Sequence, residues 1–143
     1  MRQSQKAKLI FSTCMLAVGI FSAVMIYKTL RPSPGKPYEQ ITVEQALEYM
    51  EYEENYIFCD VGTQEEYEQA HITGAVNIPY ESLGDLVLSV IDDTTQQIYL
   101  YARDQKTGDK AAKKLCEMGY INVTEVGTLK DWSAYPQMLT QAL

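Results

Sequence analysis

The segment IYLYARDQKTGDK, Ile98–Lys110, decides how the rest of this chain is interpreted. It begins with a short apolar run, continues through a polar turn and leads into the start of a helix. In a parallel α/β sheet, such a turn connects the carboxyl end of a strand to a helix N-terminus, where backbone N–H groups converge. The sequence therefore predicts that the functional site lies at this turn.

Strand-like and helix-like segments alternate along the chain. Apolar runs predict buried strands at residues 56–61, 97–102 and 121–126, with a short strand before Pro79. Helical spacing of apolar residues predicts helices that begin near Val43, Leu83 and Lys110, and a helical C-terminus over residues 128–139. A capping-box spacing at Thr42 marks the start of the first of these helices, and another at Thr63 marks the start of a further short helix. This alternation predicts an α/β fold with a mostly parallel sheet and helices on both faces.

Charge and cysteine content exclude several classes of function. All 19 acidic residues follow residue 30, so the globular part lacks the concentrated positive charge that a nucleic-acid surface requires. The three cysteines, Cys14, Cys59 and Cys116, form neither a disulfide framework nor a metal-ligand pattern. We expect Cys59 and Cys116 to be small buried side chains, with a disulfide between them as the alternative in an oxidising compartment. No metal site and no cofactor is predicted.

The N-terminal region predicts a membrane anchor. After a basic tail at residues 1–8, no charged residue occurs between Lys8 and Lys28. A helix of this length, at about 1.5 Å per residue, spans a hydrocarbon core about 30 Å thick. We therefore assign residues 9–30 to a single transmembrane signal anchor rather than to a cleaved signal peptide, because no convincing cleavage site follows.

The anchor is followed by a spacer and one domain. Residues 31–39 contain RPSPGKP, whose prolines and glycine are typical of an extended linker, and residues 40–143 form the predicted domain. Basic residues flank the anchor on both sides, but a short basic N-terminal tail favours the cytoplasm. We therefore expect a single-pass protein of the cytoplasmic membrane with its soluble domain on the extracytoplasmic side.

Four spaced segments resemble the rhodanese (sulfurtransferase homology) domain. They are DVGTQEEYEQAHITGAVNIP at Asp60–Pro79, the strand IYLYAR, AAKKLCEMGYINV at Ala111–Val123, and VGTLKDW, which ends at Trp132. The resemblance covers residues 41–132 and implies one rhodanese-like domain with a mostly parallel five-stranded sheet. It also implies sulfur transfer through a cysteine persulfide, with a nucleophilic Cys directly after the strand.

In this chain, that position is Ala102, which has no atom that can form a thiolate. We consider two alternative interpretations of the loop after the strand. It is either an ordinary solvated turn or a vestigial anion cradle for a small oxyanion or a partner's acidic group, with Thr107 as a helix cap and Arg103 and Lys106 supplying positive charge. The active-site-like loop comprises Ala102, Arg103, Asp104, Gln105, Lys106, Thr107 and Gly108.

The remaining family motif is interpreted as structural. Asp60 opens the motif, and we expect its carboxylate to accept backbone N–H bonds and hold the following turn. In the family an Arg commonly follows two positions later, where this chain has Gly62. His71, the only histidine, is interpreted as a packed residue rather than as a general base. The same structural role is assigned to Gly74, Asn77, Pro79 and Trp132.

Two classes of function follow from these residues. The leading hypothesis is a membrane-tethered, catalytically inactive rhodanese-like domain that serves as a binding or regulatory module for an unidentified protein partner. The alternative is an enzyme: a sulfurtransferase, or a related thiol or phosphatase-like activity, that uses an unconventional residue or another chain's cysteine. The sequence names neither the partner nor the oligomeric state.

Overall fold

The computed structural model describes residues 37–141, and the predicted anchor at residues 9–30 lies outside them. Within the described part of the chain, no helix is both long and apolar enough to span a membrane. The folded domain includes Tyr38, which is buried and whose hydroxyl donates to Asp109 Oδ1 at 2.7 Å. The last two residues of the predicted linker therefore belong to the domain, because β1 begins at Glu39.

Five parallel strands form the central sheet, as predicted. In sheet order they are β1 (Glu39–Gln40), β6 (Val123–Thr128), β5 (Gln97–Ala102), β2 (Tyr56–Asp60) and β4 (Val76–Asn77). The two central pairs place Asp60 beside Tyr101 and Ala102 beside Thr128. The carboxyl ends of β2, β5 and β6 therefore meet at one edge of the sheet, which is where parallel α/β sheets place their functional groups.

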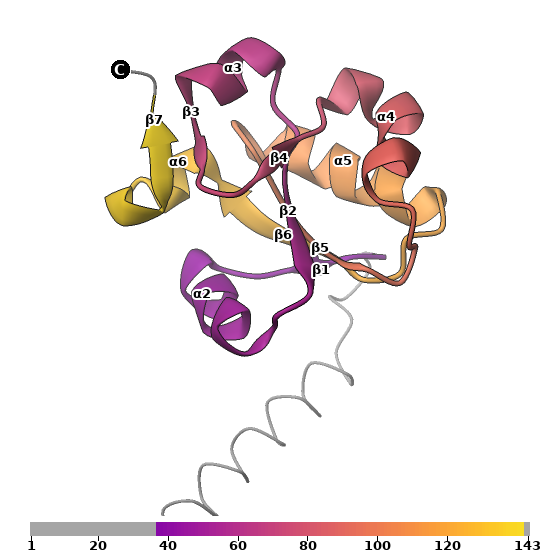
Figure 1. Ribbon diagram of the computed structural model, residues 1–143, viewed down its shortest axis with the longest axis horizontal. Helices are drawn as coiled ribbons and strands as arrows, with labels where there is room; N and C mark the ends of the chain where they lie inside the picture. Colours follow the sequence, from indigo (N-terminus) through magenta and orange to yellow (C-terminus); the bar gives the residue numbers. More distant parts are fainter. Residues whose placement is uncertain (1–36, 142–143) are drawn as a thin grey trace, which may run out of the picture. The chain divides into compact units, whose positions relative to one another are not determined.

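Helices pack on both faces of this sheet (Figure 1). They are α2 (Val43–Tyr52), α3 (Gln64–Gln69), α4 (Leu83–Val90), α5 (Gln105–Glu117) and α6 (Leu129–Trp132), with single 3₁₀ turns at Tyr80–Ser82 and Pro136–Met138. The capping boxes predicted at Thr42 and Thr63 are both present, and each starts its helix.

The side chains of β5 alternate between two hydrophobic cores, as the pleat of a strand requires. Ile98, Leu100 and Ala102 pack in one core with residues of α4 and α5. Tyr99 and Tyr101 pack in the other, with Trp132 of α6 and residues of α2. A strand that is covered on both faces must be apolar along its length, which explains the near-continuous apolar run in the sequence.

The predicted helix over residues 128–139 is wrong for most of its length. After four residues of α6, the chain passes through Pro136 and forms strand β7 (Leu139–Gln141), which pairs antiparallel with β3 (Ala70–Ile72). Pro136 lacks an N–H and disfavours helical geometry at the preceding residue, so the helix cannot continue through it. The pairing with β3, about 70 residues away in sequence, has no local signal.

Candidate functional site

Ala102 is the last residue of β5, and its side chain is 1% exposed. Its methyl group belongs to the hydrophobic core that also contains Ala111 and Ala112 of α5. The turn that follows consists only of Arg103 and Asp104, because α5 begins at Gln105. The predicted loop is therefore shorter than expected, and its second half, residues 105–108, is the first turn of the helix.

The N-terminus of α5 is capped by the carboxylate of Asp104. Asp104 accepts a hydrogen bond from the backbone N–H of Thr107 at 3.0 Å and a second from the Thr107 hydroxyl at 2.8 Å. These bonds from Thr107 hold the pKa of Asp104 below its usual value. Thr107, predicted as the cap, is instead the donor. A protein carboxylate thus already lies where the sequence predicts an anion.

Arg103 extends away from the α5 N-terminus and towards β2. Its guanidinium donates to Asp60 Oδ2 at 3.1 Å and to the carbonyl oxygen of Ala70 at 2.7 Å. Gly62 leaves room for the carboxylates beside this pair, because a Cβ atom there would lie 2.8 Å from Glu66 Oε2 and 2.9 Å from Asp60 Oδ1. Arg103 therefore supplies the cation beside Asp60 that the sequence lacks at position 62.

Asp60 is fully buried at the carboxyl end of β2. Besides the ion pair with Arg103, its Oδ1 atom accepts the backbone N–H of Gly62 at 2.8 Å. The Tyr101 hydroxyl completes the cluster and accepts a hydrogen bond from the N–H of Ile72 at 2.9 Å. Burial is the main cause that raises the pKa of Tyr101, and the nearby Asp60 carboxylate raises it further. The cluster ties together β2, β3, β5 and the turn after Ala102.

The other motif residues make structural contacts. His71 Nδ1 lies 2.8 Å from the carbonyl oxygen of Tyr67, and its ring stacks on the Tyr67 ring at a centroid distance of 3.9 Å. The Asn77 side chain donates to the carbonyl oxygens of Asp60 at 3.1 Å and Gly62 at 2.9 Å. The His71 contacts join β3 to α3, and the Asn77 hydrogen bonds hold the turn after β2 in place.

The three remaining motif residues lie at turns and in the core. Gly74 has a φ of 83°, which suits the turn before β4, and Pro79 precedes the 3₁₀ turn at Tyr80. Trp132 is fully buried, and its indole N–H donates to the carbonyl oxygen of Val126 at 2.9 Å. None of these residues presents a reactive group to solvent.

Neither described cysteine is placed to act as a nucleophile. Cys59 is buried in β2, and burial raises the pKa of its thiol to about 12. Burial also raises the pKa of Cys116, whose Sγ atom lies 3.5 Å from the carbonyl oxygen of Pro37. Both thiols are free, so the alternative of a disulfide between them is not realised. A raised pKa disfavours the thiolate that sulfur chemistry needs.

A cleft of about 270 Å³ opens beside the turn after β5. Arg103, Asp104 and Thr107 form one side, and Tyr80 and Lys110 are also among the residues that line it. The ammonium groups of Lys110 and Lys114 lie 6.0 Å and 5.4 Å from the centre of the Tyr80 ring.

In the described part of the chain, no group of three His, Cys, Asp or Glu side chains is arranged to hold a metal ion.

Sequence reasoning missed two features of the sheet edge. The pairing of Arg103 with Asp60 joins residues 43 positions apart, and only the tertiary fold brings them together. The second feature is Glu125, a fully buried acidic residue in β6. A charged residue inside a predicted buried strand was the available signal, because an ionised carboxylate is seldom buried without a partner.

Comparisons with known proteins agree with this architecture. Residues 42–135 match the rhodanese-like domain family. The chain is 33% identical over 74 residues to thiosulfate sulfurtransferase PspE of Escherichia coli (strain K12), and the match covers 52% of this chain and 71% of that protein. It is 28% identical over 96 residues to putative sulfur carrier protein YrkF of Bacillus subtilis (strain 168), covering 66% of this chain and 50% of that protein.

Solved structures show the same fold. The rhodanese-like domain of the Alr3790 protein from Anabaena sp. superposes with a TM-score of 0.65 at 25% identity, covering 72% of this chain and 79% of that one. A rhodanese with anions from E. coli superposes with a TM-score of 0.51 at 32% identity, covering 53% and 89%. The family match spans four of the five strands of the sheet, all but β1, with its helices and the turn after β5, and this chain therefore belongs to the rhodanese-like domain family.

Proposed function

We propose that this protein is a non-catalytic member of the family, a binding or regulatory module that residues 9–30 tether to the cytoplasmic membrane. The observation that carries the proposal is the state of the turn after β5. Ala102 ends the strand without an ionisable atom, and at the adjacent helix N-terminus the backbone N–H of Thr107 already donates to the Asp104 carboxylate. Sulfur transfer needs a thiolate at this edge, and the described residues supply none.

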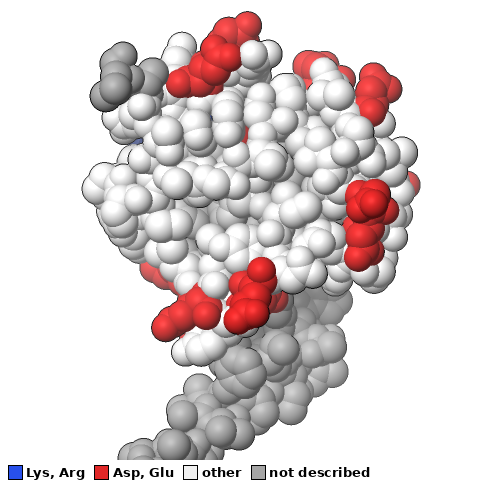
Figure 2. All heavy atoms as spheres, viewed as in Figure 1, with Lys and Arg blue, Asp and Glu red and all other residues white. Residues whose placement is uncertain are grey.

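Two further observations support the loss of catalysis. Arg103, the cation of the turn itself, already donates hydrogen bonds to Asp60 and to the Ala70 carbonyl oxygen, so its charge is partly neutralised before any anion binds. Acidic side chains are scattered over the face of the domain in Figure 2, where basic side chains are almost absent. This acidic face disfavours a nucleic acid, whose phosphates need concentrated positive charge. A small oxyanion at the turn is less favoured than a protein partner because Arg103 is engaged and the Asp104 carboxylate caps the helix N-terminus.

The tether and its orientation rest on the sequence. The uncharged run between Lys8 and Lys28 supports a single-pass anchor, and the short basic tail before it supports an extracytoplasmic domain. An anchored domain samples partners within the membrane plane, which suits a regulatory module with modest affinity.

We expect the purified full-length chain to produce no thiocyanate from thiosulfate and cyanide above the rate of a variant without the described cysteines, Cys59→Ala combined with Cys116→Ala. The physical reason is that burial raises the pKa of both thiols, so both are protonated at neutral pH, and neither stands at the end of β5. Colorimetric detection of the thiocyanate–iron complex measures the rate, with an active rhodanese as the positive control. Turnover that disappears in the double variant would assign the chemistry to these cysteines and refute the proposal.

The alternative function is sulfur transfer with a cysteine from another chain. It is favoured by the similarity to a thiosulfate sulfurtransferase and to a putative sulfur carrier protein. The same assay distinguishes it from the leading proposal: thiocyanate production that appears only when membrane extract is added, and that persists in the Cys59→Ala, Cys116→Ala variant, would support the alternative.

The role of Asp104 at the helix N-terminus can be tested with an introduced thiol. In Ala102→Cys, the Asp104 carboxylate lies two residues away and opposes ionisation of the new Cys. We expect the further change Asp104→Asn to lower the thiol pKa by about one unit, since an uncharged cap leaves the helix N-terminus to favour the thiolate. Alkylation rate against pH measures both values. Equal pKa values would show that Asp104 does not control this site.

A further inference from the structure

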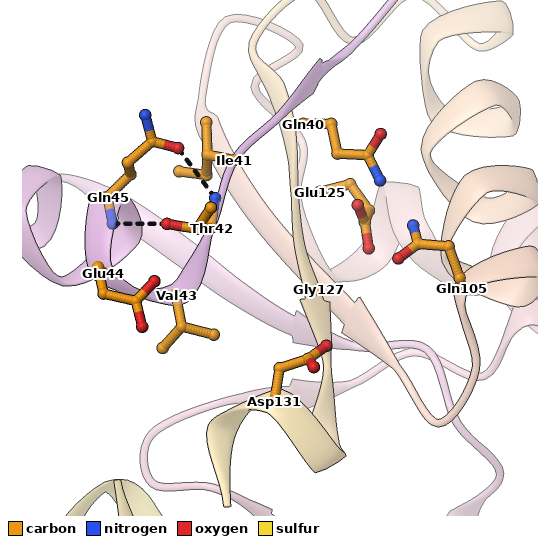
Figure 3. A pocket seen from close by; sticks show the side chains of 10 residues that line it. All are labelled: Gln40, Ile41, Thr42, Val43, Glu44, Gln45, Gln105, Glu125, Gly127 and Asp131. Carbon is orange, nitrogen blue, oxygen red and sulfur yellow. Dashed lines mark hydrogen bonds between the residues drawn. The ribbon is translucent and has the colours of Figure 1, made fainter. Parts of the chain in front are cut away.

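A second cavity, of about 490 Å³, is lined by residues of β1, the start of α2, the first residue of α5 and β6 (Figure 3). Side-chain amides of Gln40, Gln45 and Gln105 line it, together with the carboxylates of Glu44 and Asp131. No Lys or Arg is among the described residues that form its walls. The electrostatic environment of this cavity therefore favours a cation.

Glu125 is the unusual member of this cavity. Its side chain is 0% exposed, and neither carboxylate oxygen has a hydrogen-bond partner among the described residues. Figure 3 shows the carboxylate between the amides of Gln40 and Gln105. Burial raises the pKa of Glu125, while the neighbouring Gln105 and Gln40 amides act in the opposite direction. A buried carboxylate without a partner is costly and requires an explanation.

The other two carboxylates of the cavity are already satisfied. Glu44 accepts a hydrogen bond from the Tyr135 hydroxyl at 2.9 Å. Asp131 accepts the backbone N–H and the hydroxyl of Thr128 at 2.8 Å and 2.7 Å, as the cap of α6. Glu125 is thus the group in this cavity that gains most from a ligand, because it is the one of the three carboxylates that is fully buried and makes no hydrogen bond with the described residues.

The two glutamines control access to Glu125. Both Gln40 and Gln105 are exposed, so a rotamer change in either opens the carboxylate to the cavity without moving the backbone. On the other side, Gly108 leaves space for the carboxylate, since a Cβ atom there would lie only 3.1 Å from Glu125 Oε1. The carboxylate is therefore held between the first turn of α5 and the cavity.

The shape and chemistry of the walls indicate the class of ligand. The described residues offer no cluster of three metal-ligating side chains, and the cavity is far larger than a single ion needs. Ile41 and Val43 add apolar surface beside the amides. This combination suits an organic cation, whose charged head meets a carboxylate and amide oxygens while its methylene stem lies on apolar side chains.

We propose that this cavity binds a guanidinium or primary ammonium group on an alkyl stem, with Glu125 as the anionic partner and Gln40 and Gln105 as hydrogen-bonding neighbours. The cation supplies the donors that Glu125 lacks. The cation comes either from an Arg or Lys side chain of a partner protein or from a free polyamine, which share this chemistry. The site does not depend on whether the domain transfers sulfur, because Ala102 and the first cleft take no part in it.

The test is an NMR titration of the full-length chain in detergent with N-acetyl-arginine amide, and with its uncharged isostere N-acetyl-citrulline amide as the control. We expect saturable shifts of the cavity residues with the arginine derivative alone. Glu125→Gln keeps the shape of the side chain and should weaken binding about tenfold, as expected for the loss of one charge-assisted hydrogen bond. Glu54→Gln makes the same charge change at an exposed residue beyond the far end of α2 and should leave binding unchanged.

Spermidine provides the second arm of the experiment. Tighter binding of spermidine than of the arginine derivative, still dependent on Glu125, would support the site and identify a free polyamine as the source. The reverse order would support a protein side chain. Equal binding of arginine and citrulline derivatives, unchanged affinity in Glu125→Gln, or no saturable shift with any probe would overturn the proposal. The spectrum of free Glu125→Gln separates lost binding from lost folding.

Discussion

Arg103→Met lowers the free energy of unfolding by about 2–4 kcal/mol, because it leaves the Asp60 carboxylate buried without its cation. Asp60 is fully buried, whereas the Arg103 side chain is about one-fifth exposed, so the expected loss lies at the lower end for a buried ion pair. Met fills a similar volume and retains the apolar packing of the stem. Urea unfolding of the full-length chain, followed by the fluorescence of the single tryptophan, Trp132, measures the change.

Lys106→Met is the matched control for this prediction. Lys106 loses the same charge three residues away, but it is exposed, so we expect a change within about 0.5 kcal/mol. Adding Asp60→Asn to Arg103→Met removes the unpaired charge while keeping an oxygen for the Gly62 N–H. This double variant should recover part of the lost stability. If Arg103→Met and Lys106→Met unfold at the same urea concentration, the ion pair does not hold the turn.

Glu125→Gln is expected to stabilise the domain, and the gain should grow as the pH rises. Burial raises the pKa of Glu125 in the folded state above its unfolded value. The contribution of this residue to stability is therefore fully present below the unfolded pKa and is lost as the pH rises through the folded pKa. We expect the variant to exceed the wild type by about 1–3 kcal/mol at pH 8, the cost of an unsatisfied buried group, and by little at pH 4.

The comparison of the two proteins across pH isolates Glu125 from its titrating neighbours. Asp109 of α5 faces it and adds to the rise in its pKa. Glu44 of α2 and Asp131 of α6 line the same cavity, and hydrogen bonds lower the pKa of each. Their contributions to the stability of the domain therefore change in the opposite direction and are lost as the pH falls. All three are present in both proteins. A stability difference that does not change with pH would show that Glu125 is not strained by its burial.

Much of the fold could be predicted from local sequence patterns. The apolar run of β5, the capping boxes at Thr42 and Thr63, and the periodicity of α2 depend on residues within a few positions of one another. Spacing alone did not reveal which helical residues face the core. In α4, Leu83 and Val87 are buried, whereas Leu86 and Val90 are 42% and 44% exposed, because only one edge of this short helix reaches the sheet.

The candidate site was less predictable than the fold. The sequence locates the turn after β5, but it suggests Arg103 as a cation at the mouth of the loop and Thr107 as the cap. Both roles changed in the structure because other groups engage these side chains, from distant segments for Arg103 and from within the turn for Thr107. Asp60 and Ala70 engage Arg103, and Asp104 caps the helix.

The sequence by itself determined the strand–turn–helix at Ile98–Lys110, the alternation of strands and helices around it, and the absence of a thiol at Ala102. These are properties of residue identity and short-range spacing. Only the tertiary structure decided where Arg103 points, that β3 pairs with β7, and that Glu125 is buried beside a cavity without a hydrogen-bond partner. The energy of a charged side chain depends on its burial and on partners far away in the sequence, and both arise only when the sheet is assembled.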